Sequence, residues 1–344
     1  MTPLLFIKHK SFNARTVDND LIILSEKYNV KLYNSKIGRG IFYFTGFVID
    51  FLYLLFNLYR FKVVFIWFAD YHSFFPCLFS KILNKKCFVC LGGYDTHWIV
   101  PDKAITIKEK IRKYCVIKSI QLASVVFPVS NWLSTFITHL KEKDKIQVAY
   151  CCVNPDAMEA SKEIDKENLI LTVGGGGILY EAKRKKLDFF IEVGNYFNQN
   201  FPDYKAKFIL IGHEPGSETY NYFNKLIKDD NIRILPHIND TRELRIFFRK
   251  SKVYCQFSEY EAFGIAIIEA MLNEAIPIVY DGGAMPEVIN NTGIIITHYH
   301  IEETALIIKK ILDNGFESLK SGVKKRVLQN FTVNKRKEIL FKYL

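Results

Sequence analysis

The 344-residue sequence predicts an α/β protein with two doubly wound, Rossmann-like domains that face a cleft. Short apolar runs rich in β-branched residues alternate with longer segments of helical periodicity, as in parallel sheets covered by helices on both faces. The alternation occurs twice, on either side of a polar stretch without strong periodicity. We therefore expect a first domain over residues 1–153, a linker over 154–168, a second domain over 169–325 and a C-terminal helix over 326–344.

The first half of the chain predicts six strands, because six apolar runs are rich in β-branched or aromatic residues. These runs are Leu4–Lys8, Val30–Tyr33, Val63–Trp67, Cys87–Leu91, Val125–Val129 and Ile146–Tyr150. Between them, apolar residues recur at three- and four-residue spacing, which predicts helices. The helical segments are Asp18–Lys27, Ile41–Tyr59, Phe74–Leu83, Thr106–Leu122 and Asn131–Leu140.

The second half repeats the pattern. Its predicted strands are Leu169–Val173, Ala206–Ile211, Ile232–Leu235, Val253–Phe257, Ile276–Tyr280 and Gly293–Ile296. Its predicted helices are Leu187–Asn200, Ser217–Asp229, Thr241–Lys250, Ile265–Asn273, Met285–Asn290 and Ile301–Asn314. The chain finishes with Val323–Leu344, which is helical and amphipathic apart from a break at Phe331–Asn334.

The segment Ile41–Tyr59 approaches the length of a membrane span, about 20 residues. It carries Asp50 and Asn57, however, and a strand-like run over Lys62–Phe68 follows at once. Polar groups of this kind are costly in a bilayer, so a buried helix is the main prediction. An interfacial helix and a true span are the alternatives.

The net charge of +11 favours partners that carry phosphate. No zinc-finger spacing, RNA-recognition signature or basic heptad helix is present, so nucleic acid is not an expected partner. The seven cysteines are scattered in apolar contexts; Cys87 and Cys90 have the C-x-x-C spacing, but no second pair completes a metal site. We expect no bound metal and a reducing, cytoplasmic setting. The first residues, MTPLLFIKH, predict a strand and not a secretory signal.

The segment Ser258–Glu269, SEYEAFGIAIIE, is the strongest candidate site. A strand ends just before it and a helix starts near Gly264, so free N–H groups and the positive end of the helix dipole would hold a phosphate there. Glu261 lies in the loop, and Glu269 interrupts an apolar run within the helix. A carboxylate in that place needs a hydrogen-bond partner, for which sugar hydroxyls are suited. A solvated or salt-bridged helix residue is the alternative for Glu269.

A second candidate motif is Leu171–Asp188, LTVGGGGILYEAKRKKLD. A strand is followed by a glycine run and then by cations that precede a helix. A flexible turn beside cationic side chains suits a diphosphate. A solvated, basic start of a helix is the alternative for each of these residues.

The segment Ser258–Glu269 resembles the retaining glycosyltransferases of family four. Its continuation, with Ala270–Met271, Pro277, Gly282–Gly283 and Glu287, fits the same resemblance, and every lettered position of the family motif S-x-x-E-x-F-G-x-x-x-x-E-A-M is matched. These enzymes have the GT-B fold and use nucleotide-activated sugars without an essential metal. The resemblance therefore also implies a C-terminal helix that packs toward the first domain.

Carried over to this chain, the resemblance places Glu261 on the donor sugar and Glu269 on the ribose hydroxyls. The backbone around Phe263, Gly264 and Ile265 would hold the diphosphate. Ser258, which opens the motif, is a further donor-side residue.

In the second motif the resemblance makes Lys185 the family lysine and Arg184 the basic residue before it. Gly175 stands where the family has an arginine after V-G, and Lys186 replaces the usual glycine. Lys185 would thus neutralise the phosphates, with help from Arg184.

The first domain of these relatives supplies the acceptor site. The expected acceptor-side residues are Asn13 in the loop Ser11–Arg15, Gly93 in Cys90–His97, and Ser130, which would serve equally well as a helix cap. In Cys90–His97, CLGGYDTH, the family histidine position reads Gly92, whereas Asp95 matches the family aspartate. Glu261, Lys185 and Asp95 are the candidate catalytic residues.

The sequence therefore predicts a retaining, metal-independent glycosyltransferase without a cofactor. Its donor would be a nucleotide-diphosphate sugar, and its acceptor a saccharide or a lipid-linked molecule of cell-surface polysaccharide synthesis. Aromatic and basic segments suggest peripheral contact with an anionic inner membrane surface. The alternatives are a GT-B phosphorylase or epimerase, and a non-catalytic protein that binds sugar nucleotides.

Overall fold

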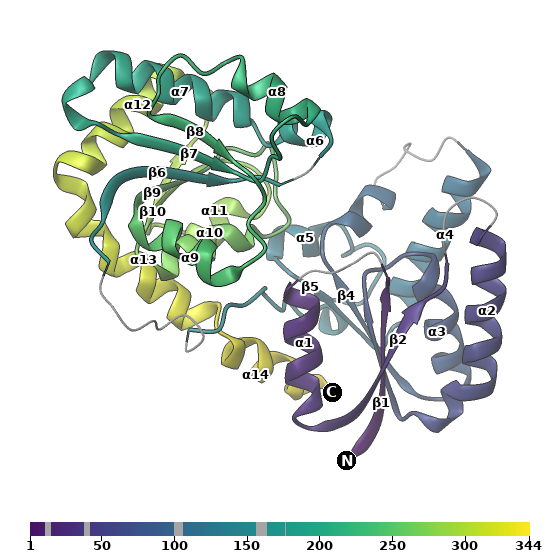
Figure 1. The fold of residues 1–344 in the computed structure, drawn as a ribbon. Helices are drawn as coiled ribbons and strands as arrows, with labels where there is room; N and C mark the ends of the chain where they lie inside the picture. The colour runs from purple at the N-terminus through teal and green to yellow at the C-terminus, as the bar shows by residue number, and fades with distance from the viewer. Residues whose placement is uncertain (11–14, 38–41, 100–105, 156–163, 176) are drawn as a thin grey trace. The chain divides into compact units, whose positions relative to one another are not determined.

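The structure, a computed structural model, describes residues 1–10, 15–37, 42–99, 106–155, 164–175 and 177–344. The chain forms two compact units (Figure 1). Unit 1 consists of Met1–Cys152 together with Val333–Leu344, and unit 2 of Val153–Thr332. Each unit is an α/β layer structure built on one parallel sheet, which is the fold class that the alternating pattern predicts.

Unit 1 is built on a five-stranded parallel sheet with the order β2-β1-β3-β4-β5. Its strands are β1 (Thr2–His9), β2 (Tyr28–Ser35), β3 (Val63–Trp67), β4 (Lys86–Leu91) and β5 (Val125–Pro128). Its helices are α1 (Arg15–Ser25), α2 (Phe42–Asn57), η1 (Leu58–Arg60), α3 (Tyr71–Ile82), η2 (Tyr94–Trp98), α4 (Ile107–Leu122), α5 (Asn131–Thr135), η3 (Lys143–Lys145) and α14 (Val333–Tyr343). In Figure 1, α2, α3 and α4 cover one face of the sheet and α1 lies on the other.

Two predicted elements of unit 1 were wrong. Ile146–Tyr150 is not a strand: it follows β5 only through an isolated bridge at Ile146 and two hydrogen bonds, because the chain leaves the sheet edge there. The predicted helix Asn131–Leu140 ends at Thr135. The hydroxyl groups of Ser134, Thr135 and Thr138 each donate to the carbonyl three residues earlier, which competes with continued helix.

Unit 2 is built on a six-stranded parallel sheet with the order β11-β10-β9-β6-β7-β8. Its strands are β6 (Glu167–Val173), β7 (Lys207–Ile211), β8 (Ile232–Leu235), β9 (Ser251–Gln256), β10 (Ile276–Tyr280) and β11 (Ile294–Ile296). Its helices are α6 (Leu179–Arg184), α7 (Leu187–Asn200), η5 (Pro202–Tyr204), α8 (Glu218–Asn224), α9 (Thr241–Lys250), α10 (Ile265–Leu272), α11 (Met285–Ile289), α12 (Ile301–Lys310), the π-helical turn η6 (Ile311–Gly315) and α13 (Phe316–Asn330). β9 and β6 are central, so the loops after them lie near the middle of the sheet's carboxyl edge.

The C-terminal helical segment is divided between the units, at the break that the sequence predicts over Phe331–Asn334. α13 ends at Asn330 in unit 2, and α14 begins at Val333 in unit 1. Arg336 of α14 forms an ion pair with Asp20 of α1, and both side chains are fully buried. Arg336 also donates to the carbonyl of Tyr150 at 2.7 Å, and Trp67 Nε1 donates to Asp20 at 2.8 Å. The pair is therefore fully hydrogen-bonded inside unit 1, which a buried charge requires.

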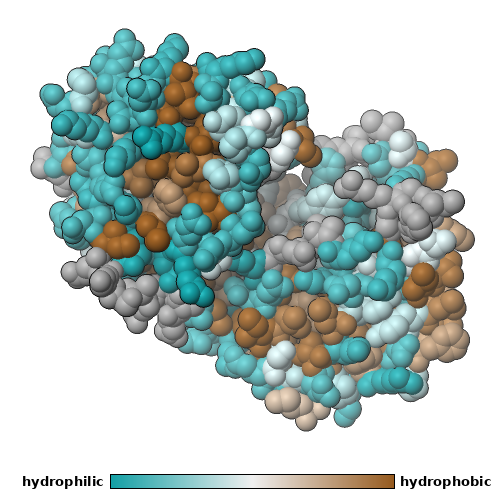
Figure 2. Space-filling model, viewed as in Figure 1, coloured by the Kyte–Doolittle hydropathy of each residue, from teal (hydrophilic) through white to brown (hydrophobic). Residues whose placement is uncertain are grey.

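Helix α2 is not the buried helix that we expected. Asp50 is buried and accepts hydrogen bonds from Tyr33 Oη, Ser35 Oγ and the backbone N–H of Lys36. The opposite face exposes six large apolar side chains: Phe44, Val48, Ile49, Leu52, Leu55 and Phe56. In Figure 2, apolar residues gather at the edge of unit 1 where Figure 1 places α2. Within the part of the chain that the structure describes, no helix is both long and apolar enough to cross a bilayer.

Removal of one partner of the Arg336–Asp20 pair is expected to destabilise unit 1 strongly. Arg336→Met leaves a buried carboxylate without its cation, which costs about 3–5 kcal/mol. Urea unfolding followed by the fluorescence of Trp67, which contacts both partners, measures this loss. Lys337→Met is the matched control, since the pair of Lys337 with Glu26 is partly exposed and contributes about 0–1 kcal/mol. Equal losses for the two variants would contradict a central role of the buried pair.

Candidate active site

The loop after β9 positions Glu261 through a chain of polar side chains. Tyr254 Oη donates to Gln256 Oε1 at 2.7 Å, and Gln256 Nε2 donates to Ser258 Oγ at 2.7 Å. Ser258 Oγ in turn donates to Glu261 Oε1 at 2.8 Å. Tyr254, Gln256 and Ser258 are buried, whereas Glu261 is partly exposed. One carboxylate oxygen of Glu261 is thus fixed from the core, which orients the group at the carboxyl edge of the sheet.

Two glycines of the turn after β10 support the same loop. A Cβ atom at Gly282 would lie 2.1 Å from the carbonyl oxygen of Glu259, and one at Gly283 would lie 2.3 Å from that of Glu261. Gly283 also has φ +62°, and the next residue, Ala284, donates its N–H to the Glu261 carbonyl at 2.8 Å. The loop between β9 and α10, residues 257–264, is called the Glu261 loop below. Its backbone packs against a turn in which only glycine fits at positions 282 and 283.

Gly264 forms the N-terminus of α10. Its φ of +91° is left-handed, and a Cβ atom there would lie 2.6 Å from Cδ1 of Ile267. This conformation sets the direction of α10, whose first N–H groups and dipole attract negative charge. Phe263, by contrast, is buried against the ring of Phe331, so its side chain belongs to the core. Ile265 is the first helical residue and is partly exposed.

Glu269 lies in the second turn of α10 and is 8% exposed. Its charge influences Arg245 of α9: burial and the charge of Arg249 lower the pKa of Arg245, and the charge of Glu269 opposes that shift. Nε of Arg245 is buried without a hydrogen-bond partner in the described structure. Arg245 was not among the predicted residues, because nothing in the sequence of α9 distinguishes it from an ordinary helix cation.

The glycine turn after β6 brings Gly175, Lys185 and the end of β7 together. Lys185 Nζ donates to the carbonyl of Gly175 at 3.2 Å. A Cβ atom at Gly212, which follows β7 with φ +127°, would lie 2.8 Å from the Cα of Gly175. His213, the next residue, is buried, and this burial together with the charge of Lys185 lowers its pKa. The Lys185 ammonium therefore lies at the glycine turn, close enough to His213 to oppose protonation of the imidazole.

The junction between α6 and α7 is tied to the Glu261 loop. Arg184 donates to the carbonyl of Tyr260 at 2.6 Å and to Glu181 Oε2 at 2.9 Å, and its guanidinium lies 4.6 Å from the Tyr260 ring centroid. Arg184 thus stabilises the loop instead of standing free for a ligand. Lys186 adopts φ +52° and pairs with Glu259 at 2.9 Å. The left-handed φ explains why a glycine is favoured at position 186, and the ion pair offsets its absence.

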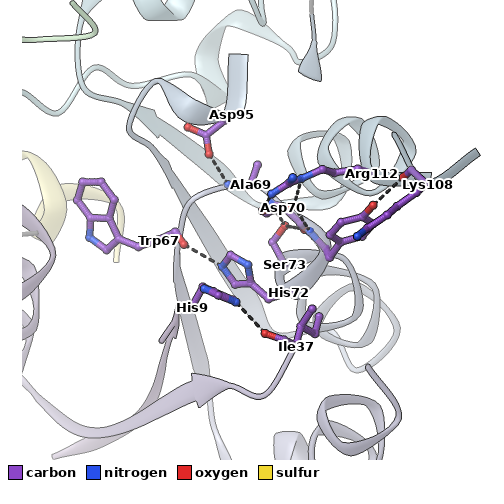
Figure 3. Close-up of polar contacts among 11 residues, drawn as sticks. His9, Ile37, Trp67, Ala69, Asp70, His72, Ser73, Asp95, Lys108 and Arg112 are labelled. Atoms are coloured by element: carbon purple, nitrogen blue, oxygen red, sulfur yellow. Dashed lines mark hydrogen bonds and ion pairs between the residues drawn. The ribbon is translucent and has the colours of Figure 1, made fainter. Parts of the chain in front are cut away.

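Asp95, which the sequence predicts as a catalytic residue of the first domain, is a fully buried carboxylate in unit 1 (Figure 3). Its Oδ1 accepts the N–H of Ala69 at 2.6 Å, and its Oδ2 accepts those of Gly92 at 2.8 Å and Gly93 at 3.1 Å. Burial raises the pKa of Asp95 to about 7, although these backbone donors act in the opposite direction. The hydrogen bonds of Asp95 therefore join the loop after β3 to the loop after β4.

A second buried carboxylate, Asp70, caps α3 and binds Arg112 of α4 with both oxygens (Figure 3). The Arg112 guanidinium lies 4.5 Å from the ring centroid of Trp98 and 5.0 Å from that of Tyr94. Nearby, His72 is buried with Nε2 at 3.0 Å from the carbonyl of Trp67, and burial lowers its pKa. These residues were not predicted, because their partners lie far apart in the sequence.

The other predicted acceptor-side residues have simpler roles. Ser130 is buried and caps α5 by accepting the N–H of Leu133 at 3.0 Å, which is the alternative that the sequence left open. Gly93 has φ +109° and begins η2. Asn13 lies outside the described residues. Among the described residues, no group of His, Cys, Asp and Glu is arranged to hold a metal ion.

Asp95→Asn tests how the hydrogen bonds and the charge of Asp95 contribute to stability. The unfolded chain loses this proton near pH 4, whereas the folded protein keeps it to about pH 7, so the free energy of unfolding of the wild type should fall as the pH rises through this window. The slope is at most about 1.4 kcal/mol per pH unit. The Asn variant should lose this pH dependence of the unfolding free energy. It also replaces one carboxylate oxygen, which accepts backbone N–H groups, by an NH₂ group, so the unfolding free energy of the variant should be lower than that of the wild type. Urea unfolding from about pH 5 to 8 measures both effects. An unchanged slope in the variant would assign the titration to another group.

Comparison with known proteins places the chain in a family. Residues 154–326 match the model of the glycosyl transferases group 1. An uncharacterised glycosyltransferase of Haemophilus influenzae is 27% identical over 133 residues, which are 38% of this chain and 35% of that protein. An uncharacterised 41.2 kDa protein in the cps region of Klebsiella pneumoniae is 24% identical over 246 residues, 68% of this chain and 63% of that protein. The matches thus span about one third and somewhat under two thirds of these two relatives.

A solved structure shows the same fold. The crystal structure of Anabaena Alr3699/HepE in complex with UDP and glucose superposes with a TM-score of 0.75 at 12% identity and covers 99% of both chains. The two parallel sheets with alternating helices are those of the GT-B fold. The matched family model covers half of the chain and includes every residue of the Glu261 loop and of α10. This chain therefore belongs to the glycosyl transferases group 1.

Proposed function

We propose that the protein transfers a sugar with retention of configuration from a nucleotide-diphosphate sugar, without a metal or cofactor. The observation that carries the proposal is the loop after β9, where a core-anchored Glu261 lies just before the α10 N-terminus. A carboxylate suited to sugar hydroxyls and a helix start suited to phosphate are thus three residues apart. The UDP and glucose in the complex of the Anabaena protein belong to the same ligand class.

In this proposal the donor binds to unit 2. The first N–H groups of α10 and the Lys185 ammonium stabilise the negative charge that develops on the leaving nucleoside diphosphate. Glu261 binds the donor sugar and Glu269 the ribose hydroxyls. Arg184 acts indirectly, because its recorded bonds hold the Glu261 loop. Cationic side chains would take the place of a metal ion, so activity should persist in EDTA.

The acceptor is assigned to unit 1, whose loops after β3 and β4 are joined by Asp95. Asp95 lacks a free oxygen for substrate and is fully buried, so we assign it a positioning role there. The proton of the acceptor hydroxyl would then pass to the leaving phosphate. This route suits a chain that has Gly92 where relatives have a histidine.

Two alternative functions make different predictions. A GT-B phosphorylase would transfer the sugar of a glycoside to inorganic phosphate, and an epimerase would convert a nucleotide sugar without any acceptor. A non-catalytic homologue would bind the sugar nucleotide without turnover, and Gly175 in place of the family arginine favours it. Hydrolysis of the donor, measured beside binding, distinguishes a binder from an enzyme.

Substitution of Glu261 and Lys185 tests the donor site. A thermal-shift screen against UDP-, GDP- and ADP-sugars first identifies the donor, since a ligand of the native state raises Tm. Lys185→Ala should lower kcat by roughly 10²–10³-fold, because it removes a cation at the leaving group. Glu261→Ala should abolish the discrimination between the sugar nucleotide and the free nucleotide in the shift assay.

Lys225→Ala and Glu302→Ala are the matched controls on unit 2. Both side chains are exposed, and the two substitutions remove the same charges as Lys185→Ala and Glu261→Ala. The site assignment is wrong if Glu261→Ala and Lys185→Ala bind and turn over the donor as these controls do. NMR of the product anomer decides whether the configuration is retained.

We further propose that the enzyme acts in the cytoplasm, on a saccharide or lipid-linked acceptor, with peripheral contact to an anionic membrane surface. The exposed face of α2 supports the contact: Phe44 and Phe56 are 73% and 64% exposed, and the only charged residue of α2 is the buried Asp50. Cations border the end of α2, where Arg60 stacks on Tyr59 at 5.5 Å and Lys85 Nζ reaches the Tyr59 carbonyl at 3.4 Å. An apolar face bordered by cations is typical of an interfacial helix.

Flotation with vesicles tests the membrane contact. The wild type should float with vesicles of phosphatidylcholine and phosphatidylglycerol more than with phosphatidylcholine alone, and salt should weaken the binding. Leu52→Glu with Phe56→Glu should abolish flotation at unchanged Tm, because both side chains are exposed. Leu306→Glu, at a similarly exposed apolar site of unit 2, is the control. Absence of wild-type binding to the anionic vesicles would remove the membrane contact but not the glycosyltransferase.

A further inference from the structure

The residue that follows β3, Phe68, has a backbone conformation that is costly for its type. Its φ is +68°, in the left-handed region, which costs an ordinary residue about 1–2 kcal/mol. The other described non-glycine residues with positive φ are Asn84, Lys186, Lys205, Glu274 and Asn290, so Phe68 is the one aromatic residue among them. Strain of this kind persists only where the surroundings enforce it, and it concentrates at functional sites.

The surroundings of Phe68 do enforce it. Its N–H donates to the carbonyl of Cys90 at 2.9 Å, which joins the end of β3 to β4. The N–H of the next residue, Ala69, donates to Asp95 Oδ1 at 2.6 Å (Figure 3). The other oxygen of Asp95 accepts N–H groups from the loop after β4. The Cys90 carbonyl therefore fixes the backbone N–H of Phe68, and the buried carboxylate of Asp95 fixes that of Ala69 and joins it to the loop after β4. These hydrogen bonds offset the cost of the left-handed conformation.

The ring of Phe68 occupies the place of a side chain at position 92. A Cβ atom at Gly92 would lie 2.3 Å from Cε1 and 3.0 Å from Cζ of Phe68. Gly92 does not have positive φ, so this position requires glycine for space and not for backbone conformation. A side chain at position 92, such as the histidine that the family resemblance implies there, cannot be accommodated unless Phe68 moves. Phe68 and Gly92 are thus a matched pair.

The ring lies where a ligand of unit 1 would be expected. The carboxyl ends of β3 and β4 meet at this edge, and in open parallel sheets ligands bind beyond the carboxyl ends of the strands. Phe68 is partly exposed, although its neighbours Trp67 and Ala69 are buried. An aromatic ring offers an apolar surface to the C–H face of a pyranose, and it has no proton to exchange. The Phe68 ring can therefore bind a sugar but cannot act as a general acid or base.

We propose that Phe68 is a specificity-determining residue of unit 1, whose ring contacts a pyranose of the acceptor in the place that a histidine occupies in related enzymes. This rests on the proposed glycosyl transfer. The left-handed conformation sets the direction of the ring, and Gly92 leaves room for it. Asp95 is a positioning residue that stabilises this conformation.

A double-mutant cycle tests whether the ring fills this space. Gly92→His alone should lower Tm by several degrees, because the imidazole meets the Phe68 ring. Phe68→Gly should cost little, since glycine adopts φ +68° without strain and so offsets the lost packing. The double variant should regain most of the loss caused by Gly92→His. If Gly92→His is as stable as the wild type, the proposed pair does not exist.

The role of the ring is tested with p-nitrophenyl pyranosides as surrogate acceptors. Donor hydrolysis, measured without acceptor, should stay within about threefold of the wild type in Phe68→Gly, whereas KM for the pyranoside should rise at least about tenfold, a loss of about 1.4 kcal/mol. Phe68→Tyr should retain the low KM, because it keeps the ring. Tyr196→Ala on unit 2 is the control for loss of an aromatic side chain.

Two results would overturn the proposal. One is an unchanged pyranoside KM in Phe68→Gly. The other is a wild type that hydrolyses the donor but accepts none of the pyranosides and is inhibited by none. A wild type that neither binds nor hydrolyses any sugar nucleotide would instead refute the glycosyl transfer itself, so the two failures are distinguishable.

Discussion

The buried ion pair between Arg336 and Asp20 joins the last helix of the chain to the first helix of unit 1. A guanidinium and a carboxylate without solvent exposure are stable only with full hydrogen bonding, and Arg336 obtains it from Asp20 and from the carbonyls of Ala149 and Tyr150. Those carbonyls belong to the segment by which the chain leaves unit 1. The helix that contributes Arg336 is the last of the chain, so both ends of unit 2 are connected to structured parts of unit 1.

In unit 2, backbone groups and buried polar side chains hold the candidate site in the same way. A carboxylate is fixed beside a helix start by the turn at Gly282–Gly283, the left-handed Gly264 and the hydrogen-bond chain from Tyr254 to Glu261. Burial, and after it the charge of Glu261, raises the pKa of Tyr254, so this hydroxyl stays a hydrogen-bond donor. A site organised in this way loses little conformational entropy on binding.

Most strands, and the strand–loop–helix context of Ser258–Glu269, could be predicted because their signals are local. Val63–Trp67, Ile232–Leu235 and Ile276–Tyr280 were predicted with the bounds that the structure has, since each is a short apolar run between turns. Ile146–Tyr150 has the same composition but pairs only at an isolated bridge, and composition does not distinguish the two cases. Likewise, nothing local shows that Arg112 reaches Asp70, or that a ring at position 68 excludes a side chain at position 92.

Two of the departures from the family pattern, at positions 186 and 92, have a second residue that offsets them, whereas Gly175 has none that we identify. Lys186 stands in a left-handed position that favours glycine, and its ammonium pairs with Glu259 of the Glu261 loop. Gly92 stands where relatives have histidine, and the ring of Phe68 fills the space. A degenerate site would show unfilled space or unpaired charge at such positions, because nothing would maintain the second residue. Filled and paired positions instead favour a site adapted to a different acceptor, which is the physical argument for an active enzyme over a non-catalytic homologue.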